Sequence, residues 1–280
     1  MQFKRKIPLN SESSVKGNNG ITLVIGGCGL YTGAPYFVSL SSLLSGSDLS
    51  YIFCEKETLI PLKVLLPEAI IVEIDFHEWI LNRVSVCVFG SGLGRPTKEK
   101  CEKICRILEY LMKRNIFIII DGDGIFFYSN NFEFFQKYKN IVLTPNYNEV
   151  KYLKDNNIHY VLKKGFVDVI EYNDRKIEIL NRSHEIDDIN QNVLASTEMT
   201  LFKPIFVKRC GGQGDILAGI LATFLSWTKT AEPDDVTDSI KTASIITRKA
   251  SEFASKKYGM ALKTREIISE IQKSMESVFK

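Results

Sequence analysis

The stretch Arg209-Cys-Gly-Gly-Gln-Gly-Asp215, followed by Ile-Leu-Ala-Gly-Ile-Leu-Ala222, carries the most information about the fold of this chain. Its three glycines come directly before an apolar segment that is predicted to be helical to about Trp227. Backbone N–H groups of such a turn can surround an anion, and the helix N-terminus adds positive potential. The stretch therefore predicts a phosphate-binding turn that opens a buried helix.

Asp215 lies in the first turn of this helix, where its charge would repel a bound phosphate. Its presence is explained if it takes a proton from a hydroxyl group that attacks phosphorus. The alternative is a glycine-rich turn without a ligand, in which Asp215 only caps the helix. The nucleotide-binding pattern G-x4-G-K-[ST] does not occur in the chain, which excludes a P-loop.

Outward from this stretch, short apolar runs alternate with helical patterns. This alternation predicts an α/β fold with a central, mostly parallel sheet that is covered by helices on both faces. The predicted strands are Ile21–Ile25, Ser50–Cys54, Ile70–Ile74, Val84–Phe89, Ile116–Ile120, Ile141–Leu143, His159–Leu162 and a hairpin of Val167–Tyr172 with Lys176–Leu180. The predicted helices are Pro35–Leu44, a helix capped by Thr97 that ends near Lys113, Gly211–Trp227, Asp235–Lys257 and Thr264–Val278.

Several predicted strands end in residues that suit a ligand site, and ligands of open α/β sheets bind outside the carboxyl ends of the strands. The turns Gly26–Gly29 and Gly90–Gly94 let backbone approach a ligand closely. Gly26–Gly29 resembles a dinucleotide fingerprint only weakly, because the sixth position counted from Gly27 is Thr32. A tight strand-to-helix turn is the favoured interpretation.

Polar residues after the later strands have two explanations each. Asp121 and Asp123 could hold a ribose or a metal-bound water, or they could form Asx turns. Asn146 could contact a ligand or cap a helix, and Glu149 could bind Mg²⁺ through water or lie on a solvated helix face. Lys164 could meet a phosphate, although a solvated lysine is the more frequent case.

Composition narrows the class of protein. The 280 residues are 45% hydrophobic and 25% charged, and 36 basic against 33 acidic residues give a net charge of +3. This balance does not indicate a nucleic-acid partner. The chain has six cysteines without a C-x2-C pair and only three histidines, which argues against a structural zinc site. The cysteines are expected to be reduced, buried thiols.

No apolar run reaches the ~18 residues that span a bilayer, so no membrane partner is expected. The chain is predicted to be cytoplasmic, although its short basic start leaves organelle targeting open. Residues 1–15 are expected to be disordered and residues 16–280 to form a single catalytic domain. Residues 181–196 are polar and are expected to form an irregular insertion. The sequence leaves a homo-oligomer open.

Taken in order, the motifs resemble the ATP-dependent NAD(P)H-hydrate dehydratases of the ribokinase-like superfamily, from about residue 20 to residue 228. The most specific segments are Tyr31-Thr-Gly-Ala-Pro-Tyr-Phe37 and Arg209–Asp215. The resemblance implies that ATP and Mg²⁺ are used to restore NADH or NADPH from the hydrates NADHX and NADPHX. Other matching pieces are Gly26-Gly-Cys28, Gly90-Ser-Gly-Leu-Gly-Arg95, Asp121-Gly-Asp-Gly124, Leu143-Thr-Pro-Asn146 with Glu149, and Lys164-Gly165 with Asp168.

The resemblance also implies roles for individual residues. Asp215 matches the catalytic carboxylate, which also touches the substrate. The other residues matching substrate-binding positions are Gly92, Asn146, Tyr147, Asn148, Glu149, Val150, Lys151 and Tyr152. Those matching ATP-binding positions are Lys164, Gly165, Phe166, Val167, Asp168, Ile205, Phe206, Val207, Lys208, Arg209, Cys210, Gly211, Gly212, Gln213 and Gly214.

The chain departs from the family pattern Gly-Pro-Gly-Leu-Gly-Arg-Asp, because Ser91 replaces the proline and Pro96 the final aspartate. The segment between Glu149 and Lys164 is shortened, apparently by a helix, and the segment between Leu180 and Arg209 is lengthened. Two rival functions are a vitamin or sugar kinase of the same superfamily and a catalytically dead nucleotide-binding protein. The intact Asp215 argues against the second.

Overall fold

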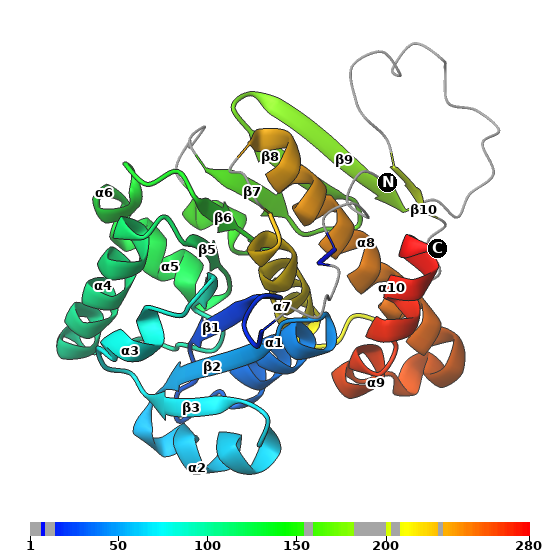
Figure 1. Cartoon of the computed structure of the whole chain (residues 1–280). Coiled ribbons are helices and arrows are strands. Elements are labelled where there is room, and N and C mark those ends of the chain that lie inside the picture. The colour runs from blue at the N-terminus through cyan, green and yellow to red at the C-terminus, as the bar shows by residue number, and fades with distance from the viewer. Residues whose placement is uncertain (1–6, 9–14, 154–158, 182–199, 203–207, 229–231) are drawn as a thin grey trace.

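The computed structural model describes residues 7–8, 15–153, 159–181, 200–202, 208–228 and 232–280, and the remaining residues are drawn as a grey trace in Figure 1. Most of the expected disordered N-terminus and of the irregular insertion at residues 181–196 lies outside these ranges. Those two expectations stay predictions.

A ten-stranded sheet runs through the described part of the chain, in the order β10-β9-β8-β7-β6-β5-β4-β1-β2-β3. Strands β1 to β7 pair in parallel, β8 is antiparallel to both of its neighbours, and β10 is parallel to β9. The strand order reverses between β1 and β4, which places the expected ligand crevice at the carboxyl ends of these two strands. The strands are β1 Ile21–Ile25, β2 Leu49–Cys54, β3 Ile70–Glu73, β4 Val86–Phe89, β5 Phe117–Ile120, β6 Ile141–Leu143, β7 Tyr160–Lys163, β8 Asp168–Tyr172, β9 Arg175–Asn181 and β10 Thr200–Phe202.

Helices cover both faces of this sheet (Figure 1). One face is covered by α1 (Gly33–Leu44), α2 (Lys56–Leu65), α7 (Gln213–Ser226), α8 (Pro233–Tyr258), α9 (Thr264–Ile268) and α10 (Ile271–Phe279). The other face is covered by α3 (Glu78–Leu81), α4 (Lys98–Lys113), α5 (Asp123–Asn130) and α6 (Phe132–Phe135). Short 3₁₀ helices occur at Val150–Tyr152 and Gly259–Ala261.

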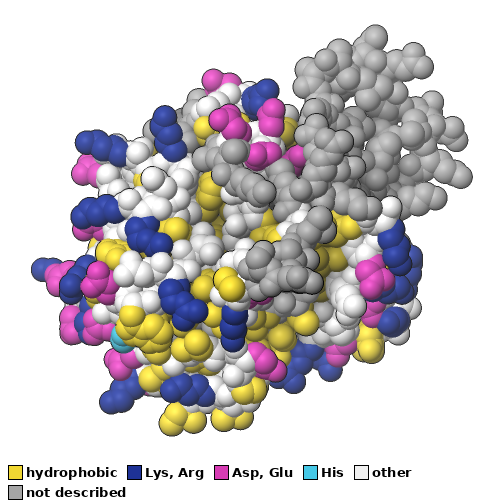
Figure 2. All heavy atoms as spheres, in the orientation of Figure 1, with side chains coloured by type: hydrophobic (Ala, Val, Ile, Leu, Met, Phe, Trp, Pro, Cys, Tyr) yellow, Lys and Arg dark blue, Asp and Glu magenta, His cyan; other side chains and the backbone are white. Residues whose placement is uncertain are grey.

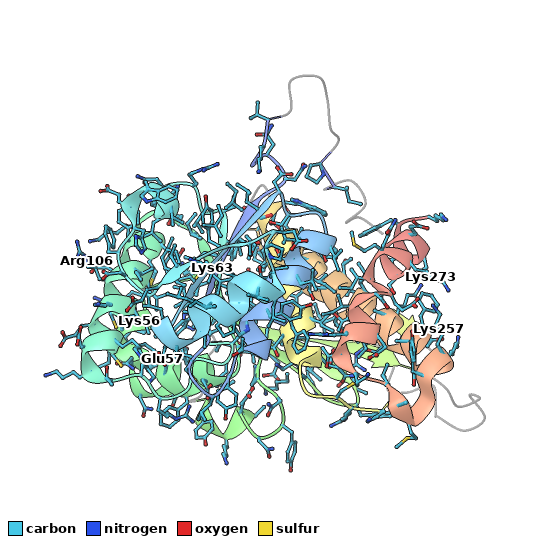
Figure 3. All side chains as sticks on the ribbon, turned by 90° about the horizontal axis from the view of Figure 1, so that it is seen from below. Lys56, Glu57, Lys63, Arg106, Lys257 and Lys273 are labelled. Carbon is cyan, nitrogen blue, oxygen red and sulfur yellow. The ribbon has the colours of Figure 1, made fainter. Side chains whose placement is uncertain are left out.

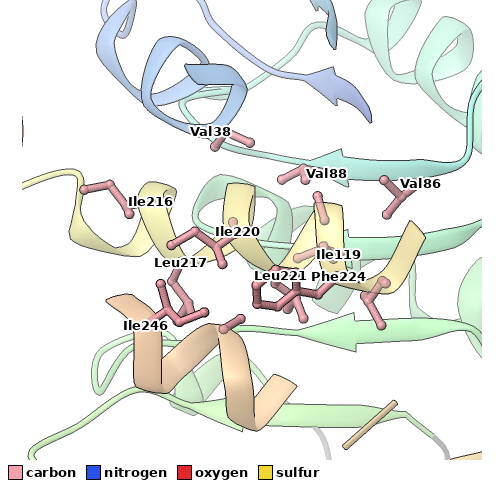
Figure 4. Packing of buried hydrophobic residues seen from close by; sticks show 14 of the residues in the cluster. Val38, Val86, Val88, Ile119, Ile216, Leu217, Ile220, Leu221, Phe224 and Ile246 are labelled. Atoms are coloured by element: carbon pink, nitrogen blue, oxygen red, sulfur yellow. The ribbon is translucent and has the colours of Figure 1, made fainter. Parts of the chain in front are cut away.

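The core is divided into two layers by the alternation of side chains along each strand. Val24 and Val88 point to the layer that contains α7, whereas the next residues, Ile25 and Phe89, point to the layer that contains α4. Helix α7 is buried on nearly every side, because the sheet, α1 and α8 surround it. Figure 4 shows its apolar residues between the strands and α8. This explains why residues 216–225, apart from Thr223, lack polar side chains and do not show the periodicity of an amphipathic helix.

Helices α1 and α7 approach each other so closely that a side chain cannot be accommodated at Gly219. A Cβ atom there would lie 2.2 Å from the Val38 carbonyl oxygen. The same pair of helices meets again at its N-terminal ends, where a Cβ at Gly212 would lie 2.8 Å from the Phe37 ring. The two segments that carry the family resemblance are therefore packed against each other.

The predicted α/β architecture and most predicted elements are confirmed. The hairpin is present, with Asn173 and Asp174 at positive φ, and Thr97 caps α4 by accepting from the Lys100 N–H. The single helix expected at Thr264–Val278 is wrong, since the chain breaks at Ser269-Glu270 into α9 and α10. The helix that Asn146 was expected to cap is absent, and only a 3₁₀ turn at Val150–Tyr152 follows it. Sequence reasoning did not predict α2, α3, α5, α6 or β10, because these are short or, in α2, interrupted by Pro61.

Charged and apolar side chains occupy different parts of the surface. The charged side chains labelled in Figure 3 are exposed and come from the outer helices α2, α4, α8 and α10. Apolar side chains gather at the lower left of Figure 2, at the end of the molecule formed by α2, β3 and α3, whose exposed residues include Ile60, Val64 and Trp79. Among the described helices, none is both long and apolar enough to cross a bilayer.

The α1–α7 contact makes a testable prediction about Gly219. Alanine in a helix interior normally stabilises by about 1 kcal/mol relative to glycine. We expect Gly219→Ala to lower the free energy of unfolding by about 1–3 kcal/mol instead, because its Cβ would force the helices apart. Denaturant unfolding measures this, with Gly29→Ala as the control, since nothing lies within 4 Å of a Cβ at Gly29. A stabilised Gly219→Ala variant would contradict the packing.

Candidate active site

Three strand-end turns are packed together at the carboxyl edge of the sheet. A Cβ at Gly26 would lie 2.2 Å from the Ser91 carbonyl oxygen, and a Cβ at Gly90 would lie 2.2 Å from the Gly124 nitrogen. The Gly27 N–H donates to the Gly92 carbonyl at 3.1 Å. The glycines therefore serve contacts within the protein, which confirms the tight-turn interpretation of Gly26–Gly29. These three turns form one side of the site, which is called the floor. The remaining site residues lie next to it.

The N-terminus of α7 faces this floor. Gly212 is the N-cap residue with a φ of +96°, a conformation that favours glycine. Asp215 makes no side-chain capping hydrogen bond. The alternative interpretation of Asp215 as a helix cap is therefore wrong.

Lys164 connects the end of β7 to the end of β5. Its Nζ donates to Asp121 Oδ1 at 2.6 Å, and the same oxygen accepts the Thr144 hydroxyl at 2.8 Å. A Cβ at Gly214 would lie 2.9 Å from Lys164 Nζ, so the ammonium stands directly over the glycine turn. The solvated-lysine interpretation fails for Lys164, whereas Lys163 does face outward and pairs with Glu171.

The Asp215 carboxyl is buried and is surrounded by charged groups of both signs. Burial, and after it the negative charge of Asp121, raise the pKa of Asp215 to about 7, although Lys164 and the Ser91 hydroxyl act in the opposite direction. Burial also disfavours the charged form of Lys164, but Asp121, Glu149 and Asp215 outweigh it and raise the pKa of Lys164. A carboxyl with a pKa near the working pH is suited to proton transfer.

Glu149 and Asn146 are hydrogen-bonded to each other in the loop after β6. The Asn146 N–H and Nδ2 donate to the two oxygens of Glu149 at 2.9 and 2.6 Å, and Asn146 Oδ1 accepts from the Glu149 N–H at 3.1 Å. This reciprocal arrangement has the hydrogen-bond pattern of a capping box, but it closes a turn. The helix-cap interpretation of Asn146 is wrong, because the 3₁₀ helix that follows begins at Val150 and its N-cap is Glu149. Burial raises the pKa of Glu149, so its side chain is not on a solvated helix face. Tyr147, in contrast, is 86% exposed.

Asp168 points away from the glycine turn and into α8. Its carboxylate accepts from Ser244 Oγ at 2.7 Å and Arg248 Nε at 3.0 Å, and Arg248 forms a two-pronged ion pair with it. Arg248 NH2 also donates to the Gly165 carbonyl at 2.9 Å. Asp168 and Arg248 therefore fix the shape of the loop after Lys164. Phe166 in this loop is exposed.

The segment before α7 is attached to the residues that follow α8. Lys208 Nζ donates to the Met260 carbonyl at 2.8 Å, and the Thr264 hydroxyl donates to the Gly211 carbonyl. Gln213 Nε2 donates to the Lys208 carbonyl at 3.2 Å. The predicted ATP-binding residues Ile205, Phe206 and Val207 lie outside the described residues.

A cavity of about 610 Å³ opens beside the floor of turns. Asp123 forms one side of it, where its oxygens accept from the Gly94 N–H at 2.8 Å and from Arg95 at 2.7 Å. Tyr31 lines the cavity and also packs against Gly92, since a Cβ at Gly92 would lie 2.9 Å from Tyr31 Cβ. The lining residues are Cys28, Gly29, Leu30, Tyr31, Glu55, Gly94, Arg95 and Asp123.

This geometry agrees with what comparison with known proteins shows. A family model described as NAD(P)H-hydrate dehydratase matches residues 22–273. The chain belongs to the NAD(P)H-hydrate dehydratase family. The ATP-dependent (S)-NAD(P)H-hydrate dehydratase of Bos taurus is 32% identical over 98% of this chain and 87% of the bovine protein. The protein of the same name from Entamoeba histolytica is 33% identical over 99% of this chain and 94% of its own length.

Solved structures show the same fold. A ribokinase-like superfamily protein from Enterococcus faecalis superposes with a TM-score of 0.72 at 20% identity, covering 98% of this chain and 93% of that protein. The ADP/ATP-dependent NAD(P)H-hydrate dehydratase of Bacillus subtilis, co-crystallized with ATP and Mg²⁺, superposes with a TM-score of 0.68 at 16% identity, covering 99% of this chain and 96% of its own. The fold of this family member is therefore ribokinase-like.

The dehydratase fold brings Asp215, Gly214, Lys164 and Glu149 together, but it does not direct Asp168 to the same place. Sequence reasoning missed Ser91, Thr144 and Arg248 as contributors to the site. Thr144 and Ser91 each follow a predicted strand, which was an available signal. Arg248 had none, because one arginine among the exposed charges of a long helix is unremarkable until the fold pairs it with Asp168.

Gly214 offers a prediction that separates ligand binding from stability. We expect Gly214→Ala to weaken ATP binding by about tenfold or more, because its Cβ would displace the Lys164 ammonium. The melting temperature should change little, since a lysine end can move. Gly212→Ala is the contrasting variant, because its clashes with Phe37 and Thr264 and its positive φ should lower stability itself. Calorimetric ATP affinity equal to wild type in Gly214→Ala would contradict this assignment.

Proposed function

We propose that this family member removes water from (S)-NADHX or (S)-NADPHX at the expense of ATP, and that Asp215 is the catalytic base. The observation that carries the proposal is the Asp215 carboxyl at the first turn of α7, with its pKa raised to about 7 by burial and the Asp121 charge. This carboxyl stands beside a glycine turn and one ammonium, where a phosphate would lie. The pairing of a base with an anion cradle suits phosphoryl transfer to a hydroxyl group.

ATP would lie with its γ-phosphate over Gly211–Gly214. The glycine N–H groups and the positive end of α7 would stabilise the charge on the phosphoryl group during transfer. Lys164 adds a positive charge on the side of β7, and the loop held by Arg248 and Asp168 forms the outer wall. The segment Lys208–Gln213, anchored to Met260 and Thr264, supplies the remaining ATP contacts.

The hydrated nicotinamide would lie between Asp215 and Gly92, next to the cavity that Tyr31 and Gly94 line. The loop from Asn146 to Tyr152 would close the other side, since the hydrogen bonds between Asn146 and Glu149 hold its start in place. A substrate placed there has its ring hydroxyl beside the carboxylate and the phosphate cradle.

Asp215 then takes the proton of the C6 hydroxyl, and the oxygen attacks the γ-phosphate so that ADP leaves. The phosphate ester is a better leaving group than hydroxide. The lone pair of the ring nitrogen expels inorganic phosphate, and loss of a proton from C5 restores the ring double bond. The net products are NADH or NADPH, ADP, phosphate and one proton. Phosphorylation therefore explains how a kinase fold performs a dehydration.

The residues present fit a Mg²⁺ ion that arrives with ATP. Asp121, Glu149 and Asp215 surround a single ammonium, so this cluster carries an excess of negative charge and oxygen ligands. Among the described residues, no group of three or more His, Cys, Asp or Glu side chains is arranged as a dedicated metal site. Mg²⁺ often keeps several waters and binds few carboxylates. Glu149 would hold it through water, and the ion would neutralise charge on the phosphates.

Three further features remain proposals about the whole chain. We propose that residues 16–280 act as one catalytic domain and that the protein works in the cytoplasm. A homo-oligomer is compatible with the exposed apolar residues of α2 and α3. The rival function, phosphorylation of a vitamin or sugar alcohol, would use the same base and cradle.

The proposed function is tested by incubating the purified chain with ATP, Mg²⁺ and (S)-NADHX while recording the near-ultraviolet absorbance of NADH. We expect NADH and ADP to appear in equal amounts. The matched control omits ATP, and a second one offers vitamin or sugar alcohols in place of the hydrate. ADP formed only with an alcohol, with no NADH from the hydrate, would replace the dehydratase with a kinase.

Asp215→Asn separates catalysis from structure. Turnover should fall by at least ~100-fold, because a positioned general base contributes roughly 10²–10⁴-fold. The effect should appear in kcat, while ATP affinity stays equal or becomes tighter after loss of a negative charge. No helix cap is lost, since Asp215 makes no capping bond. A kcat within about threefold of wild type would show that another group removes the proton.

The raised pKa of Asp215 also predicts how stability depends on pH. The folded protein holds this proton more tightly than the unfolded chain, so the contribution of Asp215 favours folding below pH ~4 and is lost as pH rises towards 7. Asp215→Asn has no such loss. Its melting temperature should therefore exceed wild type above pH 7 and converge with it near pH 4. A constant difference across this range would contradict the shift.

A further inference from the structure

The carboxylate of Asp168 is fully hydrogen-bonded within the protein. Its Oδ1 accepts from the Gly165 N–H at 3.0 Å and from Arg248 Nη2, and its Oδ2 accepts from Ser244 Oγ at 2.7 Å and from Arg248 Nε at 3.0 Å. These donors occupy the roughly four acceptor positions that a carboxylate offers. Only 4% of Asp168 is exposed. Asp168 matches an ATP-binding position of the family, yet its carboxylate is saturated by donors of the protein.

The Arg248 guanidinium bonds several parts of the turn between β7 and β8 at once. Besides the Asp168 carboxylate, it reaches two main-chain oxygens, since Nη2 donates to the Gly165 carbonyl at 2.9 Å and Nη1 to the Phe166 carbonyl at 3.3 Å. Arg248 and Ser244 lie four residues apart on α8, so they face the turn together. A planar guanidinium can serve several acceptors at fixed angles, which a lysine ammonium cannot.

The same turn carries the ammonium of the ATP site. Lys164 is its first residue, and the Lys164 N–H donates to the Pro145 carbonyl at 2.9 Å. Its Nζ is bonded to Asp121 and lies over Gly214. One end of the turn is therefore attached to the site, and the rest is attached to α8 by Arg248. Loss of the second attachment would let the main chain of the turn move while the ammonium keeps its partner.

We propose that Arg248 is a positioning residue for ATP, and that Asp168 serves ATP binding through Arg248 rather than by touching the nucleotide. This inference rests on the proposed position of ATP over Gly211–Gly214. Arg248 holds the main chain of the turn in the shape that forms the outer wall of the ATP site. Asp168 orients the guanidinium, and Ser244 orients Asp168. Helix α8 thereby determines the shape of a wall to which it contributes no residue of its own.

The test is the kinetics of Arg248→Lys. A lysine keeps the positive charge beside Asp168, but one ammonium cannot reach the carboxylate and both carbonyls. We expect the KM for ATP to rise about tenfold, which is the effect of losing one hydrogen bond from a charged donor. The kcat and the KM for (S)-NADHX should stay within about twofold of wild type, because Asp215 and the Lys164 ammonium keep their places.

Calorimetry measures the same effect without turnover. With ATP and Mg²⁺ alone, the Kd of Arg248→Lys should rise about tenfold as well. Arg175→Lys is the matched control. Arg175 belongs to the same hairpin and also pairs with α8, through Asp234 at 2.9 Å, but it lies at the opposite end of β8 and both side chains are exposed. Its replacement should leave the affinity for ATP unchanged.

A double variant tests whether Asp168 acts only through Arg248. Asp168→Asn should weaken ATP binding, and the protein with both substitutions should bind ATP about as weakly as the weaker single variant, because both act on one turn. Multiplied effects would overturn the indirect role of Asp168. Ser244→Ala removes one donor from Asp168 without leaving a charge unpaired. It should raise the Kd in the same direction by less, and it replaces Asp168→Asn if that variant does not fold.

The outcomes separate positioning from a general structural role. A Kd for ATP within about twofold of wild type in Arg248→Lys would overturn the proposal. Equal rises in the KM values of both substrates, or a fall in kcat alone, would also overturn it, because they would indicate a general disturbance of the fold. Failure of the proposed function would appear differently. The wild-type protein would then restore no NADH, while calorimetry would still distinguish Arg248→Lys from wild type.

Discussion

The site depends on the balance between one ammonium and three carboxylates at the carboxyl edge of the sheet. Lys164 is the positive group, and Asp121, Glu149 and Asp215 are the negative ones. The ammonium satisfies Asp121 by a direct hydrogen bond. Asp215 has no such direct bond to the ammonium. Its burial and the negative charge of Asp121 raise its pKa to about 7. The raised pKa of the proposed base thus results from burial and from an excess of negative charge, and the fold produces both.

This charge cluster requires strands that are distant in sequence to end at the same place. Asp121 follows β5, Glu149 follows β6, Lys164 follows β7 and Asp215 begins α7. Parallel pairing of β4 to β7 brings these ends together, because their carboxyl ends share one edge of the sheet. Helix α7 can point its N-terminus at this edge only because it is buried between the sheet, α1 and α8. The apolar core and the polar site are therefore parts of one arrangement.

Glycine contributes to the site in two separate ways. Gly26, Gly90 and Gly219 allow backbone segments to approach where a Cβ has no room, so they build the scaffold. Gly214 instead faces the Lys164 ammonium, so its missing side chain leaves space for charge and ligand. The distinction cannot be seen in the motif, in which all glycines are equal. Substitution of a scaffold glycine should therefore lower stability, whereas substitution of Gly214 should weaken ligand binding.

The sequence by itself determined the α/β architecture, most of the strands along the chain and the family, and it predicted a phosphate-binding turn at Arg209–Asp215. It could do so because these depend on local information, namely the burial of short apolar runs, the chemistry of glycine turns and the order of motifs along the chain. Tertiary structure alone decided which polar groups face one another. It turned Asp168 towards Arg248, a helix residue distant in sequence, and it brought Lys164 over Gly214. The physical reason is that hydrogen bonds and ion pairs form only over distances of a few ångströms. Between residues that are far apart in the chain, such distances arise only when the sheet and its helices have packed.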